Sequence, residues 1–204
     1  MTQTTMIKPE DVKQLRDQTG AGIMDCKRAL EESEGDVDKA VVWLRAKGLS
    51  AAAKKAGREA REGVVTSYIH HGGRLGVLLE LNCETDFVAR TPDFQTLAKE
   101  IAMHIAAASP LVVKREDLAA DTLEKEREIY RAQFAGSGKP ANVIEKIVDG
   151  KLESYYAQVC LMDQPSVRDP NVTIQQMVSA ATAKTGENVT ISRFCRFKLG
   201  DNAE

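Results

Sequence analysis

The stretch VVTSYIHHGGRLGVLLEL, residues 64–81, decides the fold of the larger part of the chain. Residues 64–70 form a run rich in β-branched and aromatic side chains, and every second position of residues 75–81 is leucine or valine. Alternation of this kind is typical of half-buried strands. Gly72 and Gly73 separate the two runs and can form a tight turn. The stretch therefore predicts a β-hairpin.

A helix is predicted to follow the hairpin, from Pro92 to about Ala108. Thr91 can cap its first turn, and proline suits the first helical position because its missing N–H needs no partner there. Residues 83–90 must therefore connect a strand to a helix. Apolar residues recur at helical spacing along one face of the predicted helix: Phe94, Leu97, Ala98, Ile101, Ile105 and Ala108.

The connection has the sequence NCETDFVAR, residues 82–90, with Phe87 and Val88 where a solvated loop would carry Ser, Asn or Gly. Two interpretations of Phe87 remain open on local grounds. Its ring can fill the protein's own core, as apolar side chains usually do. Alternatively, the strand and the helix hold it outward beside Asp86, in the manner of an aromatic anchor of an interface.

The remainder of the larger domain, which we place at residues 63–204, is mainly helical. Helices are predicted from about Glu116 to Phe134 and after Pro140, and Thr173 and Gln176 have the spacing of a capping box. The closing stretch NVTISRFCRFKLG, residues 188–200, alternates like a strand and predicts a third strand for the sheet of the hairpin. The fold class is therefore α+β, with a core of helices packed on a small antiparallel sheet.

Residues 1–48 predict a separate domain of three short helices, which end at Gly20, Gly35 and Gly48. Asp36 can cap the third helix, in which apolar residues follow the helical spacing. Helices this short are unstable singly in water, so the three must pack together as a bundle.

Residues 49–62 predict a basic helical linker. Between Arg45 and Arg61 the chain carries six basic residues and one acidic residue, Glu59, and the alanines of this stretch favour a helix. The charge can lie on a solvated linker helix, or it can steer association with an acidic partner surface.

Composition excludes several classes of function. The formal net charge of -2 gives the whole protein no long-range attraction to nucleic acid or to an anionic membrane. The 4 cysteines are far apart and form no C-x-x-C pair, so no zinc site or redox dithiol is indicated. The sequence opens with no signal peptide, and no apolar run approaches the roughly 18 residues of a membrane span. We therefore expect a cytoplasmic protein without membrane contact.

The sequence matches none of the enzyme motifs that its glycines and histidines suggest. The sequence GSGK, residues 136–139, resembles the end of a phosphate-binding loop, but Gln133 stands at the first glycine position and Pro140 at the magnesium-binding hydroxyl position. His70 and His71 would point to opposite faces of a strand, and His104 lies in a helix without metal-binding spacing. We expect no catalytic residue, no metal and no cofactor, which favours a protein that acts by binding.

Three long stretches carry a further signal: TGAGIMDCKRALEESEGDVDKAVVWLR at residues 19–45, AAAKKAGREAREGVV at 51–65 and LELNCETDFVAR at 79–90, with EIAMHIAA, SGKP and RFCRF further on. In this order they resemble the elongation factor Ts family, the guanine nucleotide exchange factors for elongation factor Tu. The similarity runs from about Ile7 to Gly200.

The resemblance implies a fold and a set of partner-binding residues. It implies an N-terminal domain similar to ubiquitin-associated domains, followed by a core of helices on an antiparallel sheet. The family's Thr-Asp-Phe-Val loop, which inserts beside the nucleotide site of the GTPase domain of elongation factor Tu and disturbs its magnesium and phosphate contacts, matches Thr85, Asp86, Phe87 and Val88. The family's N-terminal domain binds the same GTPase domain, which implicates Ile23, Met24, Lys27, Lys54 and Lys55.

The length of the chain bears on its assembly. Longer members of the family carry two copies of the core subdomain, whereas this chain has length for one. Resemblance to the short members therefore implies a homodimer. The closing strand is our candidate for the contact, and Cys195 on it could pair with its symmetry mate, although a reducing cytosol favours packing alone.

Two rival hypotheses remain. A basic nucleic-acid-binding module would use residues 45–61 and would bind tRNA with a strong dependence on salt. A metal-dependent enzyme would use the three histidines and would contain bound metal. Neither explains the position of Phe87, and we expect no direct contact with nucleic acid.

Overall fold

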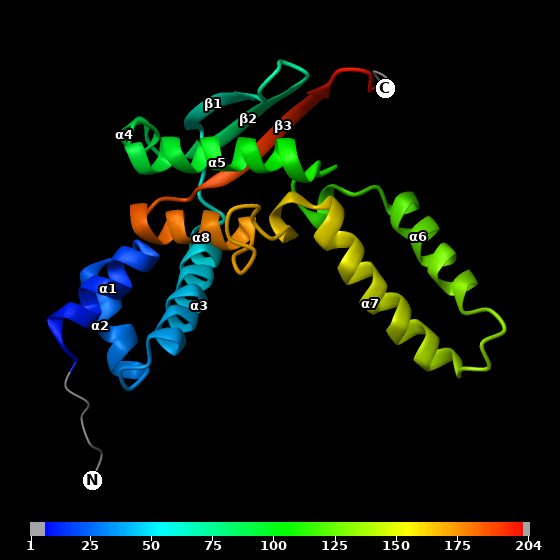
Figure 1. Ribbon diagram of the computed structural model, residues 1–204, viewed down its shortest axis with the longest axis horizontal. Coiled ribbons are helices and arrows are strands. Elements are labelled where there is room, and N and C mark those ends of the chain that lie inside the picture. Colours follow the sequence, from blue (N-terminus) through cyan, green and yellow to red (C-terminus); the bar gives the residue numbers. More distant parts are fainter. Residues whose placement is uncertain (1–6, 202–204) are drawn as a thin grey trace, which may run out of the picture. The chain divides into compact units, whose positions relative to one another are not determined.

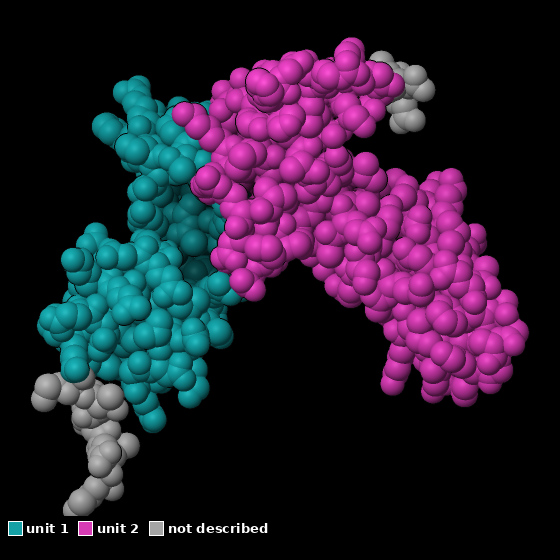
Figure 2. All heavy atoms as spheres, viewed as in Figure 1, with its two compact units in different colours: residues 1–64, 81–97, 176–190 teal, residues 65–80, 98–175, 191–204 magenta. Residues whose placement is uncertain are grey.

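The computed structural model describes residues 7–201, so residues 1–6 and 202–204, the outer ends of the two predicted domains, lie outside the described residues (Figure 1). The chain divides into two compact units, coloured separately in Figure 2. Unit 1 comprises residues 1–64, 81–97 and 176–190, and unit 2 comprises residues 65–80, 98–175 and 191–204. Helices and a small sheet make up the fold, which confirms the predicted α+β class.

The sheet has three antiparallel strands in the order β1-β2-β3: β1 is Glu62–Ile69, β2 is Leu75–Cys83 and β3 is Thr190–Lys198. The predicted hairpin and third strand are both confirmed. Gly72 and Gly73 turn the chain with φ of 88° and 69°, values that side chains with a Cβ rarely adopt. The turn is closed by the N–H of His70, which donates to the carbonyl of Leu75 at 2.8 Å.

Three helices form the predicted N-terminal bundle in unit 1: α1 is Pro9–Thr19, α2 is Ile23–Glu32 and α3 is Val37–Lys55. The carboxylate of Asp36 caps α3, since it accepts from the N–H of Lys39 at 3.0 Å. Apolar side chains from all three helices are buried together: Leu15, Cys26, Ala29, Leu30 and Ala40.

The third helix is longer than the sequence predicts. We expected it to stop at Gly48, but α3 continues to Lys55, so that expectation is wrong. A glycine ends a helix where it adopts a left-handed conformation, as Gly20 does with φ of 66°, and Gly48 is not among the residues of positive φ. Gly48 is buried instead, and a Cβ there would lie 3.7 Å from the backbone oxygen of Ser179. Its small size serves packing.

Unit 1 also contains the short helix α4, Asp86–Ala89, the first residues of α5, Pro92–Ala108, and most of α8, Ile174–Thr185. The predicted cap of α5 is confirmed, because the N–H of Phe94 donates to Oγ1 of Thr91 at 3.3 Å. The apolar side chains buried in this part of unit 1 come from strand ends and helices: Leu81, Cys83, Ala89, Phe94, Leu97, Val178 and Val189.

Unit 2 holds the long helices α6, Ala120–Gln133, and α7, Ala141–Val159, which pack on each other, and the 3₁₀ turns η1, Arg115–Asp117, and η2, Leu161–Asp163. The helix predicted from Glu116 is thus a 3₁₀ turn followed by α6. His104 is a core histidine: Nε2 lies 2.8 Å from Oε1 of Gln164, and Nδ1 accepts from the N–H of Val167 at 3.3 Å. Over residues 7–201, no helix is both long and apolar enough to cross a bilayer.

Candidate functional site

The predicted connection between β2 and α5 is a single helical turn, α4, whose start is set by Thr85. This residue has extended backbone angles, φ -130° and ψ 154°, and its Oγ1 accepts from the N–H of Val88 at 3.4 Å. An N-cap of this kind satisfies an amide that has no partner within the helix. Asp86 forms an ion pair with Arg90 at 2.8 Å. The turn is therefore ordered by its own polar side chains.

Phe87 lies on the outer side of this turn, with 80% of its surface exposed. Ala89 is buried on the inner side, and Val88 is half-buried. The local interpretation in which the ring of Phe87 fills the protein's own core is wrong. A large apolar side chain thus stands in water on a short, ordered turn.

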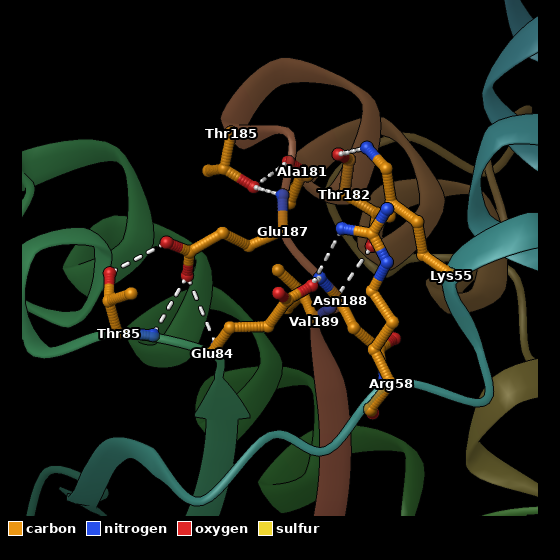
Figure 3. Close-up of polar contacts among 10 residues, drawn as sticks. All are labelled: Lys55, Arg58, Glu84, Thr85, Ala181, Thr182, Thr185, Glu187, Asn188 and Val189. Atoms are coloured by element: carbon orange, nitrogen blue, oxygen red, sulfur yellow. Dashed lines mark hydrogen bonds and ion pairs between the residues drawn. The ribbon is translucent and has the colours of Figure 1, made fainter.

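The entry to the turn is held by one carboxylate from a distant part of the chain, Glu187 between α8 and β3 (Figure 3). Its Oε2 accepts from the backbone N–H of Glu84 at 3.1 Å and of Thr85 at 3.0 Å. Its Oε1 accepts from the hydroxyl of Thr85 at 2.6 Å. Three donors from two consecutive residues therefore converge on a single side chain.

The residue after Glu187 extends this network toward the segment that follows α3 (Figure 3). The N–H of Asn188 donates to Oε1 of Glu84 at 2.6 Å, and its Nδ2 donates to the carbonyl of Arg58 at 2.8 Å. Arg58 also lies 3.5 Å from the same Glu84 oxygen. The loop after α8 thus contacts both the turn that bears Phe87 and the end of the basic stretch.

Sequence reasoning missed Glu187 and Asn188. Their partners, Glu84 and Thr85, are more than a hundred residues away in the chain, and no local pattern reports such contacts. The available signal was Gly186, which follows a helical stretch and has φ of 78°. A glycine at this place predicts the end of a helix, but it does not predict the role of Glu187, which follows it.

The N-terminal candidates Ile23 and Met24 lie on the surface, at the first turn of α2, with 56% and 74% exposure. Lys27 on the same helix is exposed and forms an ion pair with Glu31 at 3.8 Å. The structure thus brings two exposed apolar side chains and a cation to one end and face of a short helix.

The two lysines at the end of α3 differ from each other. Lys54 is exposed, whereas Lys55 is half-buried and its Nζ donates to the carbonyl of Thr182 at 3.3 Å. Part of the hydrogen-bonding capacity of Lys55 is therefore used within the chain, beside the Glu187 network (Figure 3).

The thiol beneath the turn, Cys83, is not set up as a nucleophile. Its Sγ donates to the carbonyl of Thr85 at 3.1 Å. Burial, followed by the nearby charge of Glu187, raises the pKa of Cys83 to about 11, so the thiol stays protonated at neutral pH. No cluster of three or more metal-ligating side chains occurs in the part of the chain that the structure describes.

Unit 2 carries a second apolar surface, on the outer face of the sheet and at its hairpin end. Cys195 on β3 is exposed. A groove on this surface is lined by residues of β1 and β2, the hairpin turn and the end of β3, among them Ile69, Leu78 and Phe197. Large apolar side chains are exposed along the strands and just beyond β3: Val65, Ile69, Leu78, Phe197 and Leu199.

The α+β fold thus carries an exposed aromatic side chain, Phe87, on a short turn held by hydrogen bonds. Comparison with known proteins agrees with the resemblance found in the sequence. The family model for elongation factor Ts matches residues 9–201. The chain therefore belongs to the elongation factor Ts family, whose members act in translation elongation.

Curated relatives support the same assignment over almost the whole chain. The chain is 60% identical to elongation factor Ts of Fervidobacterium nodosum over 195 residues, which cover 96% of this chain and 99% of the relative. It is 58% identical to that of Carboxydothermus hydrogenoformans over 196 residues, covering 96% and 90%. It is 55% identical to that of Caldanaerobacter subterraneus over 199 residues, covering 98% and 100%.

Proposed function

We propose that this protein is a guanine nucleotide exchange factor that binds elongation factor Tu in its GDP form and promotes release of GDP, so that GTP can be loaded. It acts in the cytoplasm and by binding alone, since no bond is made or broken. Family membership supports the partner. The observation that carries the mechanism is the exposure of Phe87 on a turn held in place by Thr85 and Glu187.

The physical basis of such an activity is linkage. A protein that binds the empty GTPase more tightly than the loaded GTPase weakens the affinity for nucleotide by the same factor. Magnesium bridges the nucleotide phosphates to a GTPase, so displacing its ligands or the phosphate-binding loop removes much of the electrostatic attraction. We assign this displacement to the turn of Thr85, Asp86, Phe87 and Val88.

The four residues of the turn would have different roles in displacing the magnesium and phosphate contacts. Phe87 is the apolar wedge, and Asp86 beside it adds a carboxylate that is paired with Arg90 in the free protein. Thr85 and Val88 hold the turn, because their side chain and backbone make its internal hydrogen bond. Truncation of Phe87 should therefore affect the partner, and truncation of Thr85 should affect the turn.

The free energy available from Phe87 alone is too small for nucleotide exchange, so a second contact with the partner is needed. Shifting a two-state equilibrium by 10⁴ takes about 5.5 kcal/mol of differential binding. Burial of a phenylalanine side chain contributes about 1.5–3 kcal/mol. We propose that the N-terminal bundle supplies part of the difference through the exposed Ile23 and Met24. Lys27, Lys54 and Lys55 would add electrostatic steering toward the GTPase domain.

We further propose that the protein is a homodimer joined through the outer face of the sheet. The exposed apolar side chains of the strands and the groove beside Phe197 support this contact, because a monomer would leave them in water. Cys195 lies on the same strand as Phe197. Packing would suffice without a disulfide, so the Cys195→Ser variant should keep the dimeric mass under reducing conditions. A monomeric mass of the native protein at micromolar concentration, with full exchange activity, would contradict the dimer.

The proposed function is tested by mixing the purified protein with elongation factor Tu loaded with fluorescent GDP and timing the loss of fluorescence. We expect catalytic amounts of the protein to accelerate release well above the spontaneous rate in excess unlabelled GDP. Added magnesium should oppose the acceleration, because it stabilises the loaded state. A release rate that does not respond to the protein would contradict the proposal.

A further inference from the structure

We propose that Glu187 is a positioning residue for nucleotide exchange, which acts on the partner only through the direction it gives to Phe87. This inference rests on the proposed function and deepens it. Glu187 accepts three hydrogen bonds from Glu84 and Thr85, the two residues that precede α4.

The ring of Phe87 is held by few contacts of its own. Because 80% of its surface is exposed, its own side chain makes few contacts that could fix where the ring stands. Its position is therefore set by the backbone of the turn. That backbone begins at Thr85, whose side chain caps α4 and whose N–H and hydroxyl both donate to Glu187.

A carboxylate suits this position particularly well. It has two oxygens that only accept, and here Oε2 receives two N–H groups while Oε1 receives a hydroxyl. Hydrogen bonds to an ionised acceptor are shorter and stronger than neutral ones. Glutamine has the same shape but offers one acceptor oxygen, so it can keep the two N–H contacts and must change the contact with Thr85.

Glu187 is itself held in place. Its N–H donates to Oγ1 of Thr185 at 3.2 Å, and that hydroxyl donates to the carbonyl of Ala181 at 2.8 Å (Figure 3). The next residue, Asn188, is buried and bonded to Arg58. The backbone of Glu187 is thus anchored to the end of α8, and its carboxylate holds the start of the turn that carries Phe87 by hydrogen bonds.

The test is a double-mutant cycle in the assay of GDP release from elongation factor Tu. We expect Glu187→Ala to slow release by about tenfold in the native background, the size expected when partly buried donors lose an acceptor. In the Phe87→Ala background the same change should slow release by less than about twofold, because the orientation of residue 87 no longer matters once its ring is absent. Glu187→Gln should recover part of the loss.

Asn188→Ala is the matched control, since Asn188 is the adjacent buried residue and its side chain bonds Arg58 rather than Thr85. Whatever its effect on release, that effect should be the same with and without Phe87. If circular dichroism shows that Glu187→Ala does not fold, the double-mutant cycle is measured with the milder Glu187→Gln variant in its place.

The outcomes separate the two proposals. If Phe87→Ala slows release but Glu187→Ala has an equal effect in both backgrounds, or no effect, the positioning role is overturned and the proposed function stands. If Phe87→Ala leaves release unchanged, the proposed role of the turn fails, and the inference about Glu187 fails with it.

Discussion

Two phenylalanines seven positions apart in unit 1 have opposite environments. Phe94, in the first turn of α5, is 2% exposed, whereas Phe87, on α4, is 80% exposed. Both follow a threonine that caps their helix, Thr91 for Phe94 and Thr85 for Phe87. Phe94 stands three positions after its cap and Phe87 only two, so similar capping directs one ring into the core and the other into solvent.

The difference shows where stability and function are separated in this part of the fold. Burial of the Phe94 ring stabilises the folded state by removing apolar surface from water. The exposed ring of Phe87 makes no such contribution to the stability of the folded state, and its apolar surface remains available to another molecule. Polar contacts, among them those of Glu187, hold the turn together with its buried Ala89.

The largest expected effect is on the buried ring. Phe94→Ala should lower the free energy of unfolding by about 3–5 kcal/mol, because it removes a buried aromatic side chain and leaves a cavity. Denaturant titration measures this change. Phe87→Ala is the matched control and should stay within about 0.5 kcal/mol of the native value, as is usual for surface changes. Equal losses for the two variants would remove the distinction between them.

A smaller effect is expected at the cap of α5. Thr91→Ala should cost about 1 kcal/mol, since Oγ1 of Thr91 accepts from the N–H of Phe94 and donates to the carbonyl of Val88 at 2.8 Å. Thr91→Ser keeps the hydroxyl and should keep most of the stability. Thermal unfolding of the three proteins side by side checks this. A serine variant as unstable as the alanine variant would show that the methyl group, and not the cap, is responsible.

The smallest effect concerns pH and a second buried side chain of α5. Burial lowers the pKa of His104 below its ordinary value, while the hydrogen bond to Gln164 acts in the opposite direction. The imidazole takes up a proton near pH 6.5 in the unfolded chain and only at a lower pH in the folded protein, so the stability is complete above pH 6.5 and falls below it. Glu100, four positions before His104, pairs with Arg168, which follows Val167, the residue whose N–H donates to Nδ1 of His104.

Denaturant titration between about pH 7 and pH 5.5 measures this contribution. The native protein should lose more stability over this range than His104→Gln, which has no group to titrate. If the two proteins lose stability in parallel, His104 does not contribute to the pH dependence.

The sequence was sufficient for the elements whose signals are local. The hairpin around Gly72 and Gly73, the helix after Pro92 and the third strand follow from alternation, turn residues and capping, all within a few positions of each other. The end predicted at Gly48 was wrong because glycine has two uses in helices, as a left-handed cap and as a site of close packing. Only the neighbouring Ser179 shows which applies.

The candidate site was predictable in part. The composition of residues 82–90 identified Phe87 as unusual, but local physics left its direction open, and the family resemblance pointed outward. Glu187 could not be found in this way, because its partners are 102 and 103 positions distant in sequence. A carboxylate after a helix-ending glycine is common on protein surfaces, and only the folded arrangement shows what it holds.

The measurement that tests the central claim most directly is the rate at which Phe87→Ala releases fluorescent GDP from elongation factor Tu. Phe87→Leu is the matched control, because it keeps an apolar side chain on the turn. We predict that Phe87→Ala unfolds like the native protein and slows release by at least about tenfold, the factor that 1.4 kcal/mol of lost binding produces, with Phe87→Leu between the two. A folded Phe87→Ala variant that releases GDP at the native rate would contradict the account.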